Sequence, residues 1–140
     1  MTQFLFKERI ADMLDYTIKQ GEFILKTTEN ISSGGEFLAS QYGMILYNST
    51  CMCLQTIGET LKQIDNRTNH QFLPKLYPST PWRNIFALRN IISHEYAATD
   101  PEEIFCIIQD DLPHLIETLR IILIDIDSNK HDDLLNSLRR

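Results

Sequence analysis

Cysteine is scarce in the sequence, with three residues in 140, and the chain does not start with the basic and apolar leader of a secreted protein. An odd number of cysteines without such a leader is typical of a reducing compartment, so we expect a cytoplasmic protein without a disulfide framework. Long apolar runs are also missing, because stretches such as residues 121–124 are far shorter than the ~20 residues that cross a bilayer. The sequence therefore predicts no membrane-spanning segment.

Basic residues are outnumbered, with 13 Lys and Arg against 19 Asp and Glu, which gives a formal net charge of −6. This balance disfavours a protein that coats nucleic acid or acidic membranes indiscriminately. Residues 62–94 differ from the rest, because they contain five basic side chains and only one acidic one. The sequence therefore predicts a focused basic surface on a protein that is otherwise acidic.

Signals for β-structure are absent, since no stretch alternates apolar and polar residues and no Asn-Gly or Asp-Gly hairpin turn occurs. Apolar residues instead recur at helical spacing. This spacing predicts helices over residues 6–25, about 38–64, 81–96 and from 101 onward. We therefore expect an all-α, up-and-down bundle of four to five helices, formed by one domain over residues 1–140 with a frayed polar tail at 128–140.

Local signals mark two helix starts and one break. Thr80 precedes Pro81, and Asp100 precedes Pro101, so each pair offers an N-cap side chain followed by proline at the first helical position. Pro113 falls inside the last apolar stripe, where its missing N–H is expected to kink the helix or divide it. The turn-forming residues before Thr80 predict a structured connection with room for one helical turn.

Side-chain sets that bind metals or phosphate are missing as well. Cys51 and Cys53 lie about 200° apart around a predicted helix, so they cannot chelate one ion together and are expected in the core. His94-Glu95 lacks the second histidine of an HExxH motif, and the glycine pair at 34–35 fits no phosphate-binding loop. We therefore expect no metal and no cofactor.

The densest polar chemistry lies on the predicted helix at 81–96. Arg83, Asn90 and His94 are spaced to share one stripe of an ideal helix. Arg89 does not share it, because five steps of 100° place it about 140° around the axis from His94. One straight helix therefore cannot aim both at one phosphate, and the spacing favours a site at a helix end or one completed by a second protomer.

Arginine and histidine together are sufficient for cleaving RNA without a metal, because the 2′-hydroxyl supplies the nucleophile. Imidazole titrates near neutrality and moves a proton, while guanidinium offers a planar fork of donors to the phosphoryl oxygens. The alternative is that Arg89 caps a bundle interface and that His94 is a partly buried residue at a helix C-terminus, where the helix dipole favours a cation.

The segment Arg89-Asn90-x-x-x-His94-x-Tyr96 resembles the Arg-x-x-x-x-His-x-Tyr signature of HEPN-domain toxins of the HepT type. One departure is Ala87-Leu88 before the arginine, where relatives often have Gly-Met. The resemblance covers about residues 50–120 and includes, in the right order, Ile57-Gly58-Glu59, Pro81-Trp82, Asp100 and Leu112-Pro113. It implies an HEPN-like helical bundle.

The resemblance also implies a metal-independent endoribonuclease, the toxin of a HEPN/MNT toxin–antitoxin system, that works as a homodimer with two motifs facing across a cleft. Arg89 and His94 are then the catalytic pair, with Asn90 as support and Arg83 as a further candidate for substrate binding. Cleavage of the RNA, of the tRNA or mRNA class, is expected to leave a 2′,3′-cyclic phosphate and a 5′-hydroxyl. Tyr96 is similar to the tyrosine to which an MntA-like nucleotidyltransferase antitoxin attaches AMP. This antitoxin is therefore the expected partner, either as a transient enzyme or in a larger complex with the toxin homodimer.

Simpler alternatives exist for several of these residues. Tyr96 packs the end of the helix in one interpretation, and Glu59 either orients Arg89 or is an ordinary solvated residue; we favour a structural role for it. Trp82 is expected to anchor the core rather than stack on a base. For the whole chain, the alternative is a non-catalytic helical module that binds a nucleotidyltransferase or is modified by it.

Overall fold

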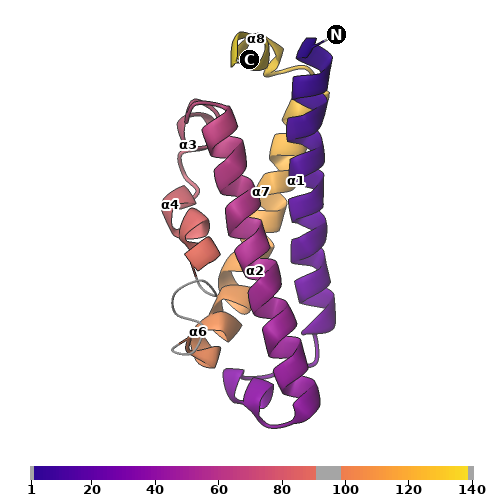
Figure 1. Cartoon of the computed structure of the whole chain (residues 1–140), viewed down its shortest axis with the longest axis vertical. Helices are drawn as coiled ribbons and strands as arrows, with labels where there is room; N and C mark the ends of the chain where they lie inside the picture. The colour runs from indigo at the N-terminus through magenta and orange to yellow at the C-terminus, as the bar shows by residue number, and fades with distance from the viewer. Residues whose placement is uncertain (1, 91–98, 139–140) are drawn as a thin grey trace.

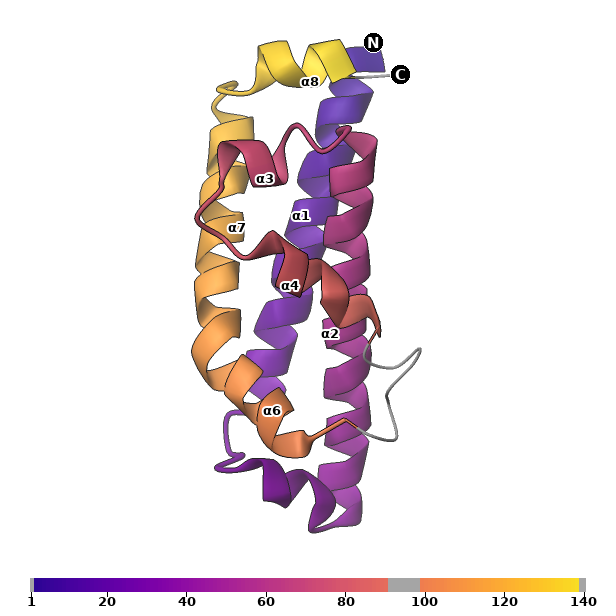
Figure 2. The ribbon, with the colours of Figure 1, turned by 90° about the vertical axis from the view of Figure 1, so that its left-hand side faces the viewer.

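The structure is a computed structural model that describes residues 2–90 and 99–138, and within these ranges it contains helices and no strand. Figure 1 and Figure 2 show three long helices side by side, α1 (Thr2–Thr27), α2 (Gln41–Arg67) and α7 (Leu112–Asp127). Between α2 and α7 the chain crosses the bundle through α3 (Leu73–Leu76), α4 (Trp82–Phe86) and the 3₁₀ turn η2 (Ala87–Arg89). The predicted all-α bundle is confirmed, and so is the helical turn in the connection after α2.

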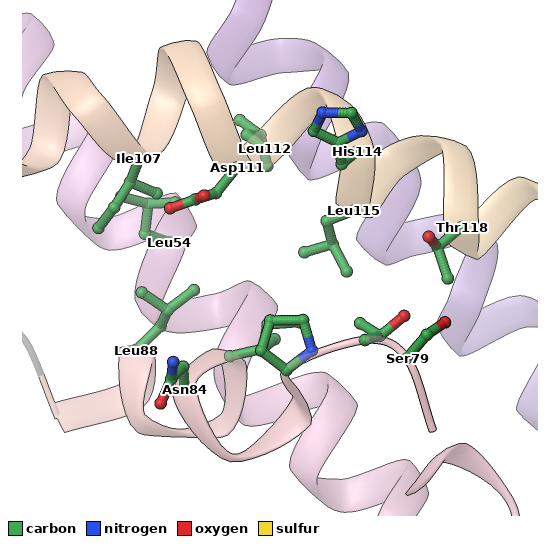
Figure 3. A pocket seen from close by; sticks show the side chains of 13 residues that line it. Leu54, Ser79, Asn84, Leu88, Ile107, Asp111, Leu112, His114, Leu115 and Thr118 are labelled. Carbon is green, nitrogen blue, oxygen red and sulfur yellow. The ribbon is translucent and has the colours of Figure 1, made fainter. Parts of the chain in front are cut away.

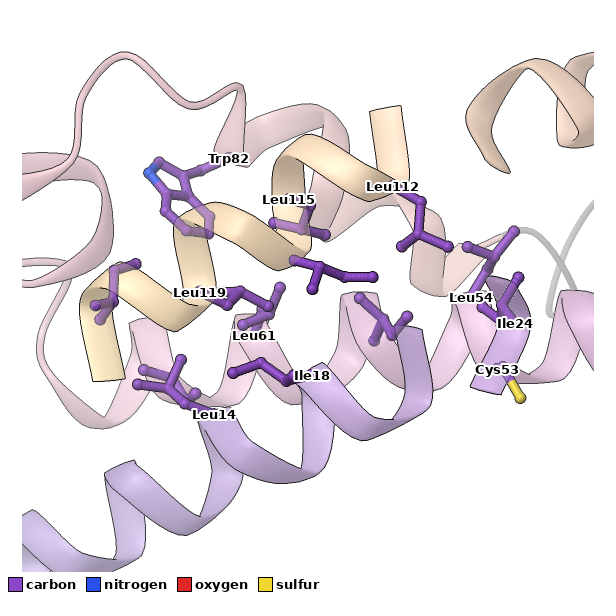
Figure 4. Packing of buried hydrophobic residues seen from close by; sticks show 14 of the residues in the cluster. Leu14, Ile18, Ile24, Cys53, Leu54, Leu61, Trp82, Leu112, Leu115 and Leu119 are labelled. Carbon is purple, nitrogen blue, oxygen red and sulfur yellow. The ribbon is translucent and has the colours of Figure 1, made fainter. Parts of the chain in front are cut away.

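The core lies where the three long helices meet, because each of them presents apolar residues at every third or fourth position. Figure 4 shows Leu14 and Ile18 of α1 pointing toward Leu61 of α2 and toward Leu115 and Leu119 of α7. In the described ranges, no helix is both long and apolar enough to cross a bilayer.

The apolar stripe predicted over residues 38–64 divides between two faces. Its later members, such as Ile57 and Leu61, are buried against the bundle. Its earlier members remain exposed by more than half, namely Leu38 at the end of the 3₁₀ turn η1 (Gly34–Leu38) and Tyr42, Ile45 and Met52 on α2. These four residues are called here the outer face of α2. The three that lie on the helix itself, Tyr42, Ile45 and Met52, have spacings of three and seven, which is the pattern of a helix–helix seam.

The last long stripe is divided as predicted. Asp100 caps α6 (Pro101–Cys106), since its side chain accepts a hydrogen bond of 3.0 Å from the N–H of Glu102. A π-helical turn, η4 (Ile107–Asp111), follows, and the N–H of Leu112 donates to the carbonyl of Ile107, five residues earlier. Pro113 lies in the first turn of α7, and because it has no N–H it cannot continue the regular ladder. The proline therefore accompanies a wide turn rather than a loop.

The expectation of a frayed tail at 128–140 is wrong for the described part, because residues 132–138 form α8 (Asp132–Leu138). Leu135 is 1% exposed, and Lys7 of α1 forms an ion pair of 2.8 Å with Asp132. The composition of this tail is polar, but one apolar residue on the inner side of a short helix is enough to dock it when an ion pair fixes its start.

A buried polar network also holds the start of α8. The hydroxyl of Tyr77 lies 2.7 Å from Oδ2 of Asp125 and 2.7 Å from Nε2 of His131. The hydroxyl donates to the carboxylate, so a neutral imidazole protonated at Nε2 donates to the tyrosine oxygen. Burial and the hydrogen bond to Asp125 raise the pKa of Tyr77, whereas burial lowers the pKa of His131.

Candidate functional site

The segment that carries the predicted catalytic arginine begins one residue later than expected. Pro81 occupies the N-cap position of α4, and the N–H of Trp82 donates to the carbonyl of Thr80 at 2.8 Å. The Thr80 side chain therefore does not cap this helix. The reason is that Trp82 is drawn into the core, where it is 4% exposed and where its Nε1 donates to the carbonyl of Tyr77 at 2.8 Å.

The same segment does not continue as one straight α-helix. After Phe86 the backbone tightens into the 3₁₀ turn η2, so residues 87–89 advance by about 120° each rather than 100°. The predicted helix is therefore present from Trp82 to Asn90, but the 3₁₀ turn at 87–89 interrupts its regular α-helical geometry. Ideal-helix angles consequently do not apply between Arg83 and Asn90. His94 and Tyr96 lie outside the described residues.

Gly58 of α2 determines how close η2 lies to the bundle. A Cβ atom at this position would lie 2.8 Å from the backbone nitrogen of Arg89, 2.9 Å from the carbonyl oxygen of Ile85 and 2.9 Å from Cβ of Leu88. Two of these neighbours are backbone atoms, which cannot move without shifting the whole turn. Gly58 is thus the positioning residue that sequence reasoning missed, although a lone glycine inside a helical stripe is a known signal for close approach.

Aromatic packing fixes the other end of the segment. The rings of Trp82 and Phe86 stack with centroids 6.1 Å apart, and Nζ of Lys62 lies 5.0 Å from the centroid of Phe86. Lys62 also reaches Oδ2 of the buried Asp65 at 3.6 Å. The expectation that Trp82 anchors the core is confirmed, and the cation–π contact ties the segment to α2 a second time.

The polar side chains of the segment face outward. Arg83, Arg89 and Asn90 are exposed, and Glu59 is exposed one residue beyond Gly58. Arg67 of α2 and Lys75 of α3 are exposed too. Figure 2 shows α3 and α4 together on one face of the bundle, so several cations of the basic stretch 62–94 come from neighbouring elements.

The cysteines of α2 pack in the core, as predicted. Cys51 and Cys53 are both buried, and burial raises the pKa of the Cys51 thiol to about 11. A thiol with a raised pKa is a poor nucleophile at neutral pH. Within residues 2–90 and 99–138, no three His, Cys, Asp or Glu side chains converge in the manner of a metal site.

Comparison with known proteins assigns this arrangement to a class. The family described as "Ribonuclease HepT-like" matches residues 8–122, so the chain belongs to the HepT-like ribonuclease family. A similar protein is "Putative RNase MJ1380" of Methanocaldococcus jannaschii, which is 28% identical over 116 residues, or 83% of this chain and 98% of the relative. No solved structure matches the chain significantly. The resemblance seen in the motif residues is confirmed at the level of the family.

Proposed function

We propose that the protein is a metal-independent endoribonuclease in which Arg89 and His94 act on the scissile phosphate. Membership of the ribonuclease family, together with an exposed Arg89 on a turn that Gly58 holds against α2, supports this role for the arginine. His94 takes the proton of the 2′-hydroxyl and the 2′-oxygen attacks phosphorus. The bond between phosphorus and the 5′-oxygen breaks, and that oxygen takes a proton from water. Arg89 neutralises the charge that builds on the phosphoryl oxygens. The products are a 2′,3′-cyclic phosphate and a 5′-hydroxyl.

Two protomers complete the site in this proposal. The outer face of α2 exposes Leu38 together with Tyr42, Ile45 and Met52, and the last three are at a helix–helix spacing, which favours a symmetric contact between two copies of α2. Gly58 lies farther along the same helix and faces η2 rather than the outer face. The proposal places the two η2 turns, one from each protomer, at a shared cleft. Asn90 and Arg83, both exposed, support the RNA there.

Charge supports a polyanionic substrate for this cleft. Lys62, Arg67, Lys75, Arg83 and Arg89 are the basic residues of the stretch 62–94, and Asp65 is its acidic residue. Asp65 is buried and lies 3.6 Å from Nζ of Lys62, so it offsets that lysine and not the exposed Arg67, Lys75, Arg83 and Arg89. Two such segments around one cleft attract RNA, while the acidic remainder of the chain repels it.

We further propose regulation through Tyr96 by an MntA-like nucleotidyltransferase antitoxin, in a toxin–antitoxin pair. AMP added two residues from His94 introduces bulk and negative charge where RNA must enter. After incubation with the partner enzyme and ATP, intact mass should rise by AMP units in the wild type. The same rise in Tyr96→Phe would place the acceptor elsewhere.

The direct test of the activity is RNA cleavage in EDTA. The wild type should cut RNA and leave cyclic phosphate ends, whereas Arg89→Ala and His94→Ala should each lower the rate by at least a factor of about 10². Lys26→Ala, on the exposed end of α1, serves as a matched loss of one positive charge. Intact RNA with the wild type, or equal cutting by His94→Ala, would rule out this mechanism and favour the non-catalytic module.

A further inference from the structure

A cavity of about 520 Å³ lies between the segment α4–η2 and the helices η4 and α7. Figure 3 shows its two walls, with Asn84 and Leu88 on one side and Asp111, Leu115 and Thr118 on the other. Its size is within the range of sites that enclose small organic ligands. Because Leu88 directly precedes Arg89, the cavity adjoins the proposed catalytic turn.

The cavity has apolar side chains along its walls and polar side chains at its ends. Leu54, Leu88 and Leu115 supply apolar surface from three different elements. Figure 3 shows Ser79 and Thr118 facing each other at one end, while Asp111 points toward the wall that Leu54 and Leu88 form. This arrangement suits a flat ring with apolar faces and a polar edge.

The carboxylate of the cavity belongs to a π-helical turn. Asp111 is the last residue of η4. Turns of this kind are frequent at functional sites. Asp110, its neighbour in the same turn, does not line the cavity.

The charges select the chemistry of the ligand. No lysine or arginine is among the described residues that line the cavity; its ionisable side chains are Asp111 and His114, both exposed. This part of the lining therefore lacks a permanently charged cation for a phosphate group. An ionised aspartate only accepts hydrogen bonds and therefore pairs with donors. Guanine presents two adjacent donors, N1–H and the 2-amino group, and adenine and cytosine each present an amino group. Uracil presents one N–H between two carbonyl oxygens, which a carboxylate repels.

We propose that this cavity takes an unpaired RNA base with an amino group on its Watson–Crick edge, guanine above all, and that Asp111 reads that edge. The inference rests on the proposed ribonuclease function. Splayed bases of single-stranded RNA are commonly recognised in this way. The phosphates that flank the base stay outside, where Arg83 and Arg89 are exposed. The cavity thus gives the enzyme a base preference close to the cleavage point.

The test measures binding without cleavage. Fluorescence anisotropy compares four labelled 2′-O-methyl pentanucleotides, UUXUU with X as G, A, C or U, which lack the attacking hydroxyl. The wild type should bind the guanine oligonucleotide roughly tenfold more tightly than the all-uridine one, with adenine and cytosine in between. Asp111→Asn should abolish the preference, and Asp110→Asn, the same change one residue away, should keep it.

A second variant guards against indirect effects. Thr118→Phe fills one end of the cavity and should remove the preference, with circular dichroism and thermal melting as checks of the fold. Equal affinity of the wild type for all four oligonucleotides, or an unchanged preference in Asp111→Asn, would overturn the proposal. Saturation-transfer NMR with free guanosine distinguishes a base within RNA from a free nucleoside as the ligand. A signal from guanosine without any preference among the oligonucleotides would overturn the RNA base as ligand.

These outcomes remain separable from the proposed function. Cleavage of ordinary RNA without base preference in binding would remove the cavity proposal and leave the ribonuclease. A clear preference in binding without any cleavage would remove the ribonuclease and leave the cavity as a site for RNA bases.

Discussion

Gly58 is the residue on which the arginine-bearing turn rests. The close contacts with the backbone of Arg89 and Ile85 mean that the orientation of η2 depends on the absence of a side chain on α2. Lys62, one helical turn farther on, holds the same segment through the ring of Phe86. The position of Arg89 is therefore set by packing contacts of its segment with α2.

Gly58→Ala should lower both activity and stability. In a helix interior this change normally stabilises a protein by about 0.5–1 kcal/mol, so a lower Tm reports the steric conflict with η2. We expect ribonuclease activity to fall by at least a factor of about ten, because small displacements of catalytic groups are costly. Cleavage rates and thermal melting measure the two effects.

Gly35→Ala is the matched control for this substitution. Its added Cβ would meet only Oγ of Ser33, at 3.8 Å, which is ordinary contact. This variant should keep wild-type activity. A Gly58→Ala protein that is as active and as stable as the wild type would contradict the positioning role of the glycine.

At the scale of elements, the sequence predicted those helix boundaries that depend only on residues within one helical turn of the boundary. The cap at Asp100 and the break near Pro113 follow from the side chain and the missing N–H of those residues themselves. The start of α4 and the 3₁₀ turn η2 depend on contacts with distant residues, since Trp82 is drawn toward Tyr77 and Arg89 toward Gly58. Periodicity could not reveal these contacts.

The candidate site likewise has features that the local sequence indicates and features that depend on contacts between distant residues. Arg89 could be proposed as a functional residue from the sequence, because its chemistry and its spacing to His94 are properties of the sequence. The cavity could not, because its lining comes from three separate parts of the chain, residues 54, 79–88 and 107–118. The sequence also could not separate the buried face of α2 from its outer face, since both carry apolar residues at helical spacing.

The docking of α8 should depend on pH through His131. Burial lowers the pKa of this histidine below its usual 6.5, although the carboxylate of Asp125 opposes the shift. The folded protein therefore favours neutral imidazole, and the unfolded chain takes up more protons once the pH falls below about 6.5. Stability should be fully present above that pH and decrease toward pH 5.5.

Thermal melting between pH 7.5 and 5.5 measures this effect. His131→Gln should flatten the pH dependence, because glutamine does not titrate. His114→Gln, which changes an exposed histidine of α7, should leave it as in the wild type. An equal loss of stability with acid in His131→Gln and the wild type would show that other groups are responsible.

At the scale of the whole molecule, the central claim is that two protomers, joined through the outer face of α2, complete each RNA-cleaving site. Leu38, Tyr42, Ile45 and Met52 are 56%, 70%, 68% and 58% exposed in the single chain. In this claim, the cleft between two η2 turns is where an acidic protein concentrates its positive charge on RNA. It also provides a second copy of the motif to complete the site.

Mixing inactive variants tests this claim most directly. Arg89→Ala and His94→Ala, each inactive by itself, should regain about a quarter of wild-type RNA cleavage in EDTA after subunit exchange, since half of the dimers then hold one intact composite site out of two. Adding Ile45→Glu to both chains should abolish the recovery by separating the protomers, and adding Ile124→Glu, an equally exposed position on α7, should preserve it. Recovery that requires an intact Ile45 is the predicted result. No recovery from exchanged dimers would contradict a site shared between protomers.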